Sequence, residues 1–226
     1  MLLKEITLKK RNYFCLWSGG HDSALTLYHA TKKTDILCLI TAMQDYSNQT
    51  KPNFFSPAVL RAQSDQLNIP LLIYNSDTEN HLESFAKTLG SIKKHDLVGG
   101  FFPFINQPEQ KNVLSELCQL EKIDAYFPLE NREKEALLSE FIELGFKAKI
   151  IAVNERYLTR DLLNRDLDKE TLNEIRSRKV DLFGENSEFQ TILYEAPYFK
   201  QALQIKEGDI NLKNGYWVVD VSITSK

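Results

Sequence analysis

Strand-like and helix-like segments alternate along residues 1–130, and this alternation constrains the fold more than any other feature of the chain. Residues 36–43 (ILCLITAM) are almost continuously apolar, as in a parallel strand that is covered on both faces. Ser56 and Pro57 then supply a helix N-cap and a favoured first helical residue. Further strands are expected at 13–17, 71–74, 97–98 and 124–127, and further helices after residue 20, over 81–89 and from 108. The pattern predicts an α/β fold, with an open parallel sheet and helices on both faces.

The alternation becomes less regular after Pro128, but it does not stop. A helix carrying Leu137, Leu138 and Phe141 is expected to end at Gly145, and a strand to follow over 149–153. Charges dominate residues 157–180, where apolar side chains still recur at helical spacing, at Leu163, Leu167 and Ile175. A terminal strand is expected over 217–223. We therefore predict two parts that share an interface, a domain over 1–130 and a smaller α/β lobe over 131–226.

Composition and charge narrow the class of protein. With 226 residues, 42% of them hydrophobic and 26% charged, the chain can bury a core of its own, which excludes disordered and low-complexity classes. The 28 Lys and Arg are outnumbered by 31 Asp and Glu, so a nucleic-acid or anionic-membrane partner is disfavoured. The three cysteines are widely spaced and form no C-x-x-C pair, which argues against disulfides or a zinc ribbon. No apolar run reaches the length of a membrane span, so a soluble cytoplasmic protein is expected.

Residues 17–23 (WSGGHDS) place two adjacent glycines and two hydroxyl groups between a buried strand and the start of a helix. Glycines allow backbone N–H groups to approach a phosphate, and the dipole of the following helix also favours negative charge. Ser18 and Ser23 can donate to phosphate oxygens. Asp22 would repel a bare phosphate, so it suits such a turn chiefly by holding a divalent cation or by capping the helix. On local chemistry alone, an ordinary turn with a helix cap explains these residues equally well.

The turn also matches a known motif. Neither G-x-x-x-x-G-K-[ST] nor G-x-G-x-x-G occurs in the sequence, but S-G-G-x-D-S follows the first strand directly. This string resembles the pyrophosphate loop (PP-loop) of the N-type ATP pyrophosphatase, or adenine nucleotide alpha hydrolase-like, superfamily, which has a HUP, Rossmann-like fold. The superfamily includes argininosuccinate, asparagine and GMP synthetases and several tRNA-modifying enzymes. The resemblance implies that ATP is cleaved between its α and β phosphates, so that a substrate oxygen becomes adenylated and a nucleophile, often ammonia, displaces AMP.

A second motif lies near the C-terminal end. Residues 184–191 (GENSEFQT) place Glu185 and Glu188 three positions apart, before an apolar strand. Taken alone, they read as two solvated charges that flank a strand. The stretch resembles the G-E-x-G-E-[FY]-x-T motif of the diphthine-ammonia ligase family, which joins a PP-loop domain to a smaller C-terminal substrate domain. The segments RAQSDQLNIPLL and ELCQLEKIDAYFPL resemble that family as well, so the resemblance covers most of the chain.

The chain departs from the family's pattern at four positions. His21 stands where the family's loop carries lysine, and Ser187 replaces the second glycine of the C-terminal motif. Histidine is mostly neutral at pH 7, so it supplies less positive charge to a phosphate than lysine does. Val113 replaces an arginine and Glu130 replaces a tryptophan. The resemblance therefore supports nucleotide chemistry more directly than it supports a particular acceptor.

What the resemblance implies is an ATP-dependent amidating ligase, with ATP and Mg²⁺ as cofactors and ammonia and an unidentified carboxylate acceptor as partners. On this interpretation residues 1–130 bind ATP and residues 131–226 bind the acceptor. Two alternatives stay open, a non-catalytic nucleotide-binding module and a tRNA-modifying enzyme that uses the same loop. A homo-oligomer is compatible with the sequence.

The expected site follows from the two motifs and from the carboxyl edge of the sheet, where open α/β sheets bind ligands. The expected catalytic residues are Asp22, Ser23, Glu185 and Glu188, with Asp22 also the expected metal ligand. The expected nucleotide-binding residues are Ser18, Gly19, Gly20, His21, Asp22 and Ser23 in the turn, Ala42 and Met43 beside the adenine, and Gly99 and Gly100. The expected acceptor-binding residues are Glu185, Asn186, Glu188 and Thr191.

Overall fold

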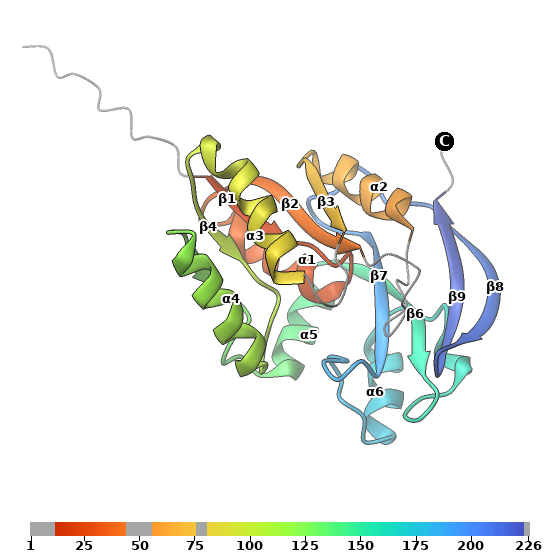
Figure 1. Ribbon diagram of the computed structural model, residues 1–226. Coiled ribbons are helices and arrows are strands. Elements are labelled where there is room, and N and C mark those ends of the chain that lie inside the picture. Colours follow the sequence, from red (N-terminus) through yellow and green to blue (C-terminus); the bar gives the residue numbers. More distant parts are fainter. Residues whose placement is uncertain (1–11, 44–55, 76–80, 224–226) are drawn as a thin grey trace, which may run out of the picture.

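The computed structural model describes residues 12–43, 56–75 and 81–223, and its first part is built on one parallel sheet (Figure 1). Five strands lie in the order β3-β2-β1-β4-β5, and every neighbouring pair is parallel. The strands are β1 (Asn12–Leu16), β2 (Asp35–Met43), β3 (Leu71–Asn75), β4 (Leu97–Phe101) and β5 (Asp124–Tyr126). The open parallel sheet predicted from the alternation is confirmed.

Helices cover both faces of this sheet, because alternate strand residues enter two separate cores. Cys15 of β1 and Leu39 of β2 belong to one cluster. Their direct neighbours in the sequence, Phe14 and Ile40, belong to the other. The helices of the first face are α1 (His21–Thr31) and α2 (Pro57–Leu67). Those of the second face are α3 (His81–Ile92) and α4 (Pro108–Leu120), with the short 3₁₀ helix η1 (Lys93–His95) after α3. This period-two division is what a buried parallel strand requires.

The second part of the chain forms an antiparallel sheet in the order β7-β6-β9-β8. Its strands are β6 (Lys147–Asn154), β7 (Phe189–Glu195), β8 (Ile205–Lys213) and β9 (Tyr216–Ile223). The helices of this part are α5 (Lys134–Glu143), the 3₁₀ helix η2 (Arg160–Leu162) and α6 (Lys169–Ser177). The smaller α/β lobe is thus confirmed as a fold, while the division at residue 130 stays a prediction.

The charged stretch 157–180 differs from the expected helix. α6 begins only at Lys169, where the Asp168 side chain accepts a hydrogen bond from the Thr171 N–H over 2.9 Å. The residues before it run beside β6 instead, with Asn164 in the left-handed region at φ 64°. Backbone bonds of 2.8 Å from Asn164 to Ile150 and from Leu167 to Ala148 hold them there. Pairing with a neighbouring strand therefore overrode the helical spacing of the leucines, which are still buried.

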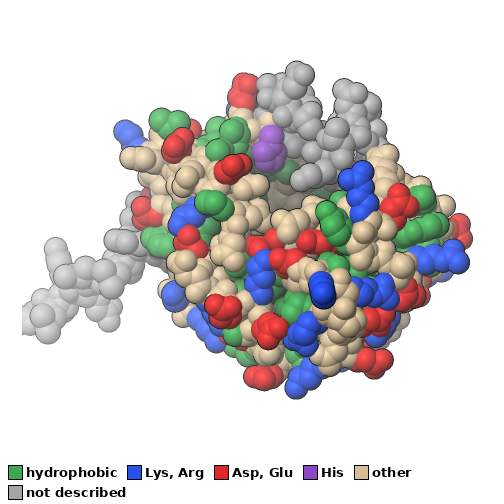
Figure 2. All heavy atoms as spheres, turned by 90° about the horizontal axis from the view of Figure 1, so that it is seen from below, with side chains coloured by type: hydrophobic (Ala, Val, Ile, Leu, Met, Phe, Trp, Pro, Cys, Tyr) green, Lys and Arg blue, Asp and Glu red, His purple; other side chains and the backbone are tan. Residues whose placement is uncertain are grey.

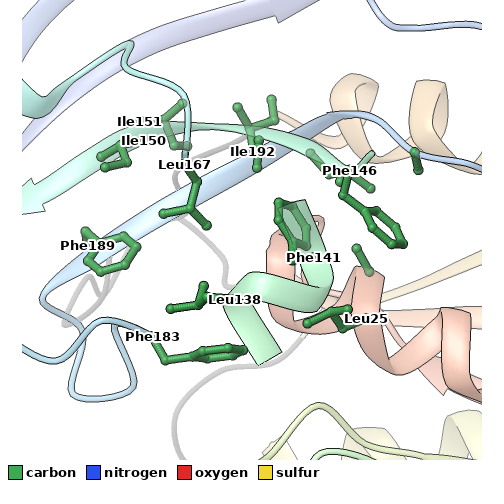
Figure 3. Packing of buried hydrophobic residues seen from close by; sticks show 14 of the residues in the cluster. Leu25, Leu138, Phe141, Phe146, Ile150, Ile151, Leu167, Phe183, Phe189 and Ile192 are labelled. Atoms are coloured by element: carbon green, nitrogen blue, oxygen red, sulfur yellow. The ribbon is translucent and has the colours of Figure 1, made fainter. Parts of the chain in front are cut away.

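One hydrophobic cluster continues from the first sheet into the second (Figure 3). Leu25 of α1, Phe141 of α5 and Ile192 of β7 are fully buried within it. Burial of apolar surface is the main stabilising contribution to folding. The two parts are therefore held together by a shared core, as the predicted interface requires.

The surface carries both signs of charge. Lys and Arg side chains are interspersed with Asp and Glu over the face that Figure 2 shows. None of the helices that the structure describes combines the length and the apolar composition needed to cross a bilayer.

Candidate functional site

The glycine turn (residues 17–23) leaves β1 at the carboxyl edge of the parallel sheet. β1 lies between β2 and β4, so the chain connections diverge there, and open α/β sheets bind ligands at such a point. Gly19 has φ +81°, and a Cβ at this position would lie 2.8 Å from Gln63 Oε1 and from Leu60 Cδ2. Both backbone conformation and space therefore require glycine at position 19.

A network of hydroxyl groups and one carboxylate closes the turn. Ser18 Oγ lies 3.0 Å from Asp22 Oδ1 and 3.0 Å from Ser23 Oγ, and it accepts a 3.3 Å hydrogen bond from the Gly20 N–H. Ser23 in turn donates to the Gly20 carbonyl over 3.1 Å. Gly20 is the N-cap of α1 and no side chain of the described residues caps the helix, so Asp22 does not serve as its cap. Its carboxylate is held at the mouth of the turn instead.

The two sequence motifs meet in one cavity of about 180 Å³. The glycine turn supplies one wall, the segment after β4 a second wall, and the C-terminal motif a third. The lining residues are Ser18, Gly20, His21, Asp22, Pro103, Gln107, Phe183, Gly184, Glu185, Ser187, Phe189, Gln190 and Thr191. Residues 18–22 and 183–191 are thus brought together by the tertiary fold, although more than half the chain separates them.

Glu185 lines this cavity and is held from two sides. Its Oε1 accepts a 3.1 Å hydrogen bond from the backbone N–H of Asn106, and its Oε2 pairs with the ammonium of Lys134, which also pairs with Asp181. Burial alone would lower the pKa of Lys134, but its hydrogen bonds to Asp181 and Glu185 raise it. Lys134 therefore stays charged, and Glu185 is fixed between α5 and the segment after β4.

Glu188 forms hydrogen bonds with Asn186 and does not line the cavity. Glu188 is only 5% exposed, and its oxygens accept hydrogen bonds from the Asn186 N–H (2.9 Å) and from the Asn186 side chain (3.1 Å). Ser187 between them has φ 65°, the left-handed conformation in which the family motif has glycine. In the structure, therefore, Glu185 lines the cavity, whereas Glu188 stabilises the turn formed by residues 186 and 187.

His21 is buried behind the turn rather than presented as a surface cation. Thr191 Oγ1 lies 3.2 Å from the backbone N of His21 and 2.8 Å from its Nδ1, and the ring packs against Phe183 at 4.6 Å between centroids. Burial lowers the pKa of His21, while the Asp22 carboxylate and the nearby Phe183 carbonyl oppose that shift without reversing it. Its Nε2 has no hydrogen-bond partner among the described residues. The ring is therefore a neutral packed group at pH 7.

Four residues expected near the nucleotide are not among those that line this cavity, namely Ala42, Met43, Gly99 and Gly100. Met43 is buried in the core at the end of β2, with Ala42 beside it. Gly99 and Gly100 lie inside β4 and not beyond its end, where they pair with Tyr13 and Phe14. A Cβ on Gly100 would lie 2.0 Å from the Phe14 ring, so the glycine is required by packing. The strand ends later than expected, and the cavity is lined by Pro103 and Gln107 of the segment that follows it.

Several lining residues were not expected from the sequence. Three of them lie in or next to the C-terminal motif, so the position of the motif in the sequence was a signal for them: Phe183, Phe189 and Gln190. Gln107 carries no comparable signal, because a polar residue before a helix is ordinary. Within the part of the chain that the structure describes, the lining contains no Lys or Arg, and no three His, Cys, Asp or Glu side chains are grouped as a metal site. A divalent cation would therefore need oxygen atoms from a bound ligand in addition to Asp22.

Comparison with known proteins places two family models on the chain. Residues 11–123 match the diphthamide synthase N-terminal domain, and residues 133–224 match the diphthamide synthase C-terminal domain. No match was found among curated proteins.

Two solved structures are similar at low identity. One is a predicted subunit of tRNA methyltransferase from Methanocaldococcus jannaschii, with 14% identity and a TM-score of 0.40 over 82% of this chain and 99% of that one. The other is the U34-tRNA thiolase NcsA from Methanococcus maripaludis, with 14% identity and a TM-score of 0.38 over 61% of this chain and 57% of that one.

Proposed function

The chain belongs to the diphthamide synthase family, and from this premise we propose that it is an ATP-dependent ligase that joins ammonia to a carboxylate. The observation that carries the proposal is the single cavity in which the glycine turn faces the C-terminal motif. A nucleotide site and an acceptor site must adjoin if one reaction is to use both. The cavity lies at the carboxyl edge of the sheet, where ligands of open α/β folds bind.

The glycine turn is proposed to hold the phosphates of ATP. Backbone N–H groups at the start of α1 and the helix dipole favour an anion there. Since the described lining contains no Lys or Arg, we propose that Mg²⁺ accompanies the phosphates, with Asp22 and the Ser18 hydroxyl beside it. These oxygen donors suit Mg²⁺, which when bound would neutralise phosphate charge. His21, being neutral, contributes through its packing and not through charge.

The proposed reaction has two steps. An oxygen of the acceptor carboxylate attacks the α-phosphorus of ATP, the bond from that phosphorus to the oxygen leading to the β-phosphorus breaks, and pyrophosphate leaves. Ammonia then attacks the acyl carbon, AMP leaves with the former carboxylate oxygen, and the nitrogen loses a proton. The residues of the cavity assist mainly by positioning the reactants and by stabilising charge.

Glu185 is proposed to face the acceptor and the incoming ammonia. It is the carboxylate of the C-terminal motif that reaches the cavity, and the Asn106 amide and Lys134 hold it in one orientation. A fixed carboxylate can accept a hydrogen bond from ammonia and favour the ammonium that develops. Glu188 is proposed to act indirectly, by holding the Asn186–Ser187 turn on which Glu185 depends.

The proposal is tested by identifying the products of ATP. The protein is incubated with Mg-ATP, ammonium chloride and a diphthine-bearing protein substrate, and nucleotides and phosphates are separated by chromatography. We expect AMP and pyrophosphate in equal amounts over many turnovers, and continued turnover only when both ammonium and the acceptor are present. ADP with inorganic phosphate would contradict the proposed cleavage.

A non-catalytic nucleotide-binding module is the second candidate. It is favoured by the buried, neutral His21 in place of a charged lysine in the turn. Under that alternative, Mg-ATP would bind with a measurable calorimetric affinity but would not be cleaved in the assay above. Binding of tRNA in a filter assay would instead support the tRNA-modifying alternative, which the excess of Asp and Glu over Lys and Arg disfavours.

A further inference from the structure

At Leu193, the outer edge of β7 is bonded to the glycine turn and to α2, and among the described residues no other strand pairs with it there. β7 is an edge strand of its sheet, and at Leu193, which faces Ala148 of β6, the backbone N–H and carbonyl point toward the first part of the chain. The Leu193 N–H donates to the Gly19 carbonyl over 2.9 Å, and the Leu193 carbonyl accepts from Gln63 Nε2 over 2.8 Å. The open N–H and C=O groups of an edge strand are available for hydrogen bonds with another segment. Here the N–H pairs with the glycine turn and the carbonyl with Gln63 of α2.

Gln63 of α2 connects these groups, and its amide oxygen and both its amide hydrogens make hydrogen bonds. The side chain is fully buried; its Oε1 accepts from the Trp17 indole N–H over 3.0 Å, and its Nε2 donates to Gly19 and to Leu193. Since an indole can only donate, the amide oxygen must face Trp17, and the two amide hydrogens must face the two carbonyls. A buried amide with this set of partners has one orientation. Removing it would leave the Trp17 indole N–H and the Leu193 carbonyl without these partners, while the Gly19 carbonyl would keep only the bond from the Leu193 N–H.

Thr191 makes a second connection from the same strand. It lies two residues before Leu193, and its hydroxyl accepts from the backbone N–H of His21 and shares a hydrogen bond with His21 Nδ1. A Cβ on Gly20 would lie 3.3 Å from both the Thr191 carbonyl and its hydroxyl oxygen. The hydroxyl thus holds the first residue of α1, and the backbone of β7 lies against the residue before it.

These contacts decide which way the turn's peptide groups point. In a trans peptide the N–H of Gly20 points opposite to the carbonyl of Gly19. Because Gln63 and Leu193 hold that carbonyl toward β7, the Gly20 N–H is directed to the other side, where Ser18 and the cavity lie. A flipped peptide would instead present a carbonyl oxygen to an anion. Holding the carbonyl therefore favours binding of a phosphate.

We propose that Gln63 and Thr191 are positioning residues of the nucleotide site, so that β7 of the C-terminal lobe is a structural part of the phosphate-binding turn. The proposal rests on the proposed function in that the bound anion is a phosphate of ATP. It goes further because it makes phosphate binding by the N-terminal sheet depend on a strand of the other lobe.

The first test compares three threonine variants of the full chain. Thr191→Val removes the hydroxyl at nearly constant volume, Thr191→Ser keeps it, and Thr171→Val makes the same change at a buried threonine of α6 away from the turn. Hydrogen–deuterium exchange is measured for a peptide covering residues 17–23, and Mg-ATP affinity is measured by calorimetry. We expect Thr191→Val to raise exchange in this peptide and to weaken Mg-ATP binding, each by about tenfold, because the His21 N–H and Nδ1 lose their buried hydroxyl partner.

The two controls separate positioning from general destabilisation. We expect Thr191→Ser to recover most of the affinity and protection lost in Thr191→Val, and Thr171→Val to lower the melting temperature without changing either quantity. Gln63→Met, which keeps the length of the side chain but no polar group, should act like Thr191→Val and more strongly, because it removes three buried hydrogen bonds and leaves the Trp17 indole N–H and the Leu193 carbonyl without these partners.

The possible results decide the two proposals separately. If exchange in residues 17–23 is unchanged in both Thr191→Val and Gln63→Met, or rises equally throughout the C-terminal lobe, the positioning role is wrong. If the wild-type protein does not bind Mg-ATP while the variants still loosen the turn locally, the proposed nucleotide function fails and the dependence of the turn on β7 stands. Local loosening together with weaker Mg-ATP binding supports both.

Discussion

Asp22 determines how the glycine turn can accept a charged ligand. Its carboxylate is held 3.0 Å from the Ser18 hydroxyl and lines the cavity, where it would repel phosphate unless a cation lay between them. A substitution that keeps the shape and removes the charge therefore separates cation binding from phosphate binding.

We predict that Asp22→Asn weakens binding of Mg-ATP by tenfold or more, on the order of 1.4 kcal/mol, because it removes the charged oxygen ligand. Binding of ATP in the presence of EDTA should be unchanged or stronger, since the repulsion is also removed. Calorimetric titration with and without Mg²⁺ measures both effects. Equal weakening under the two conditions would show that Asp22 does not act through a cation.

The buried imidazole of His21 makes stability depend on pH. Burial holds its pKa in the folded protein below the ordinary value of 6.5, which it regains on unfolding. As the pH falls below about 6.5, the unfolded chain binds a proton that the folded protein does not, so the free energy of unfolding decreases. Above that pH neither state is protonated at His21, and this contribution is constant.

We predict that this decrease between pH 7 and pH 5 is smaller in His21→Asn than in the wild type. Burial also lowers the pKa values of His29 and His81, so the variant should retain part of the slope. Urea unfolding at several pH values measures the difference. Parallel curves for the two proteins would mean that His21 titrates normally in the folded state.

At the scale of single elements, the packing of β4 against β1 depends on a missing side chain. Gly100 faces the ring of Phe14, and a Cβ there would lie 2.0 to 2.5 Å from three ring carbons. No rearrangement of a buried ring in a close-packed interior is free of strain. The two neighbouring strands can therefore remain in register only with glycine at this position.

We predict that Gly100→Ala lowers the free energy of unfolding by about 3 kcal/mol through overpacking. Gly90 in α3 is the matched control, because a Cβ at this position would have no atom of the described residues within 4 Å. Gly90→Ala should raise stability by about 0.5–1 kcal/mol, since alanine restricts the unfolded chain and suits a helix. Urea denaturation of both variants measures the contrast, and equal effects would contradict the assigned packing.

At the scale of the whole molecule, the shared core couples the two sheets. Phe141 of α5 is fully buried between α1 and the antiparallel sheet, and it stacks on Phe146 with 5.0 Å between ring centroids. Side chains from both sides of the interface lie around it (Figure 3). A cavity at this position is therefore felt by both parts of the protein.

We predict a single cooperative unfolding transition, and we expect Phe141→Ala to shift the whole of it by about 3–5 kcal/mol. Differential scanning calorimetry should give equal calorimetric and van't Hoff enthalpies in both proteins. Two separate transitions, of which Phe141→Ala moves only one, would show that the parts fold independently in spite of the common core.

Local patterns in the sequence are sufficient for most of the fold. The strand–helix alternation, the glycine turn after β1 and the apolar strands β2 and β6 all follow from residues close together in the chain, whose hydrophobic periodicity reports burial directly. β8 was not expected from the sequence, because its charged and polar residues do not alternate with apolar ones to form a continuous apolar face. Eight of its nine residues are exposed. Its pairing with β9 comes from the neighbouring strand and not from its own composition.

The site, by contrast, combines two kinds of information. The sequence by itself determined the two motifs, since Gly19 and Glu185 can be recognised within their own short segments. Only the tertiary structure decided which groups face the cavity: it directed Glu185 inward and Glu188 onto Asn186, and it placed Gln63 between Gly19 and Leu193. The physical reason is that a hydrogen bond between residues 130 positions apart leaves no local pattern in the chain. Such a bond exists only after the shared core has brought α2 and β7 together.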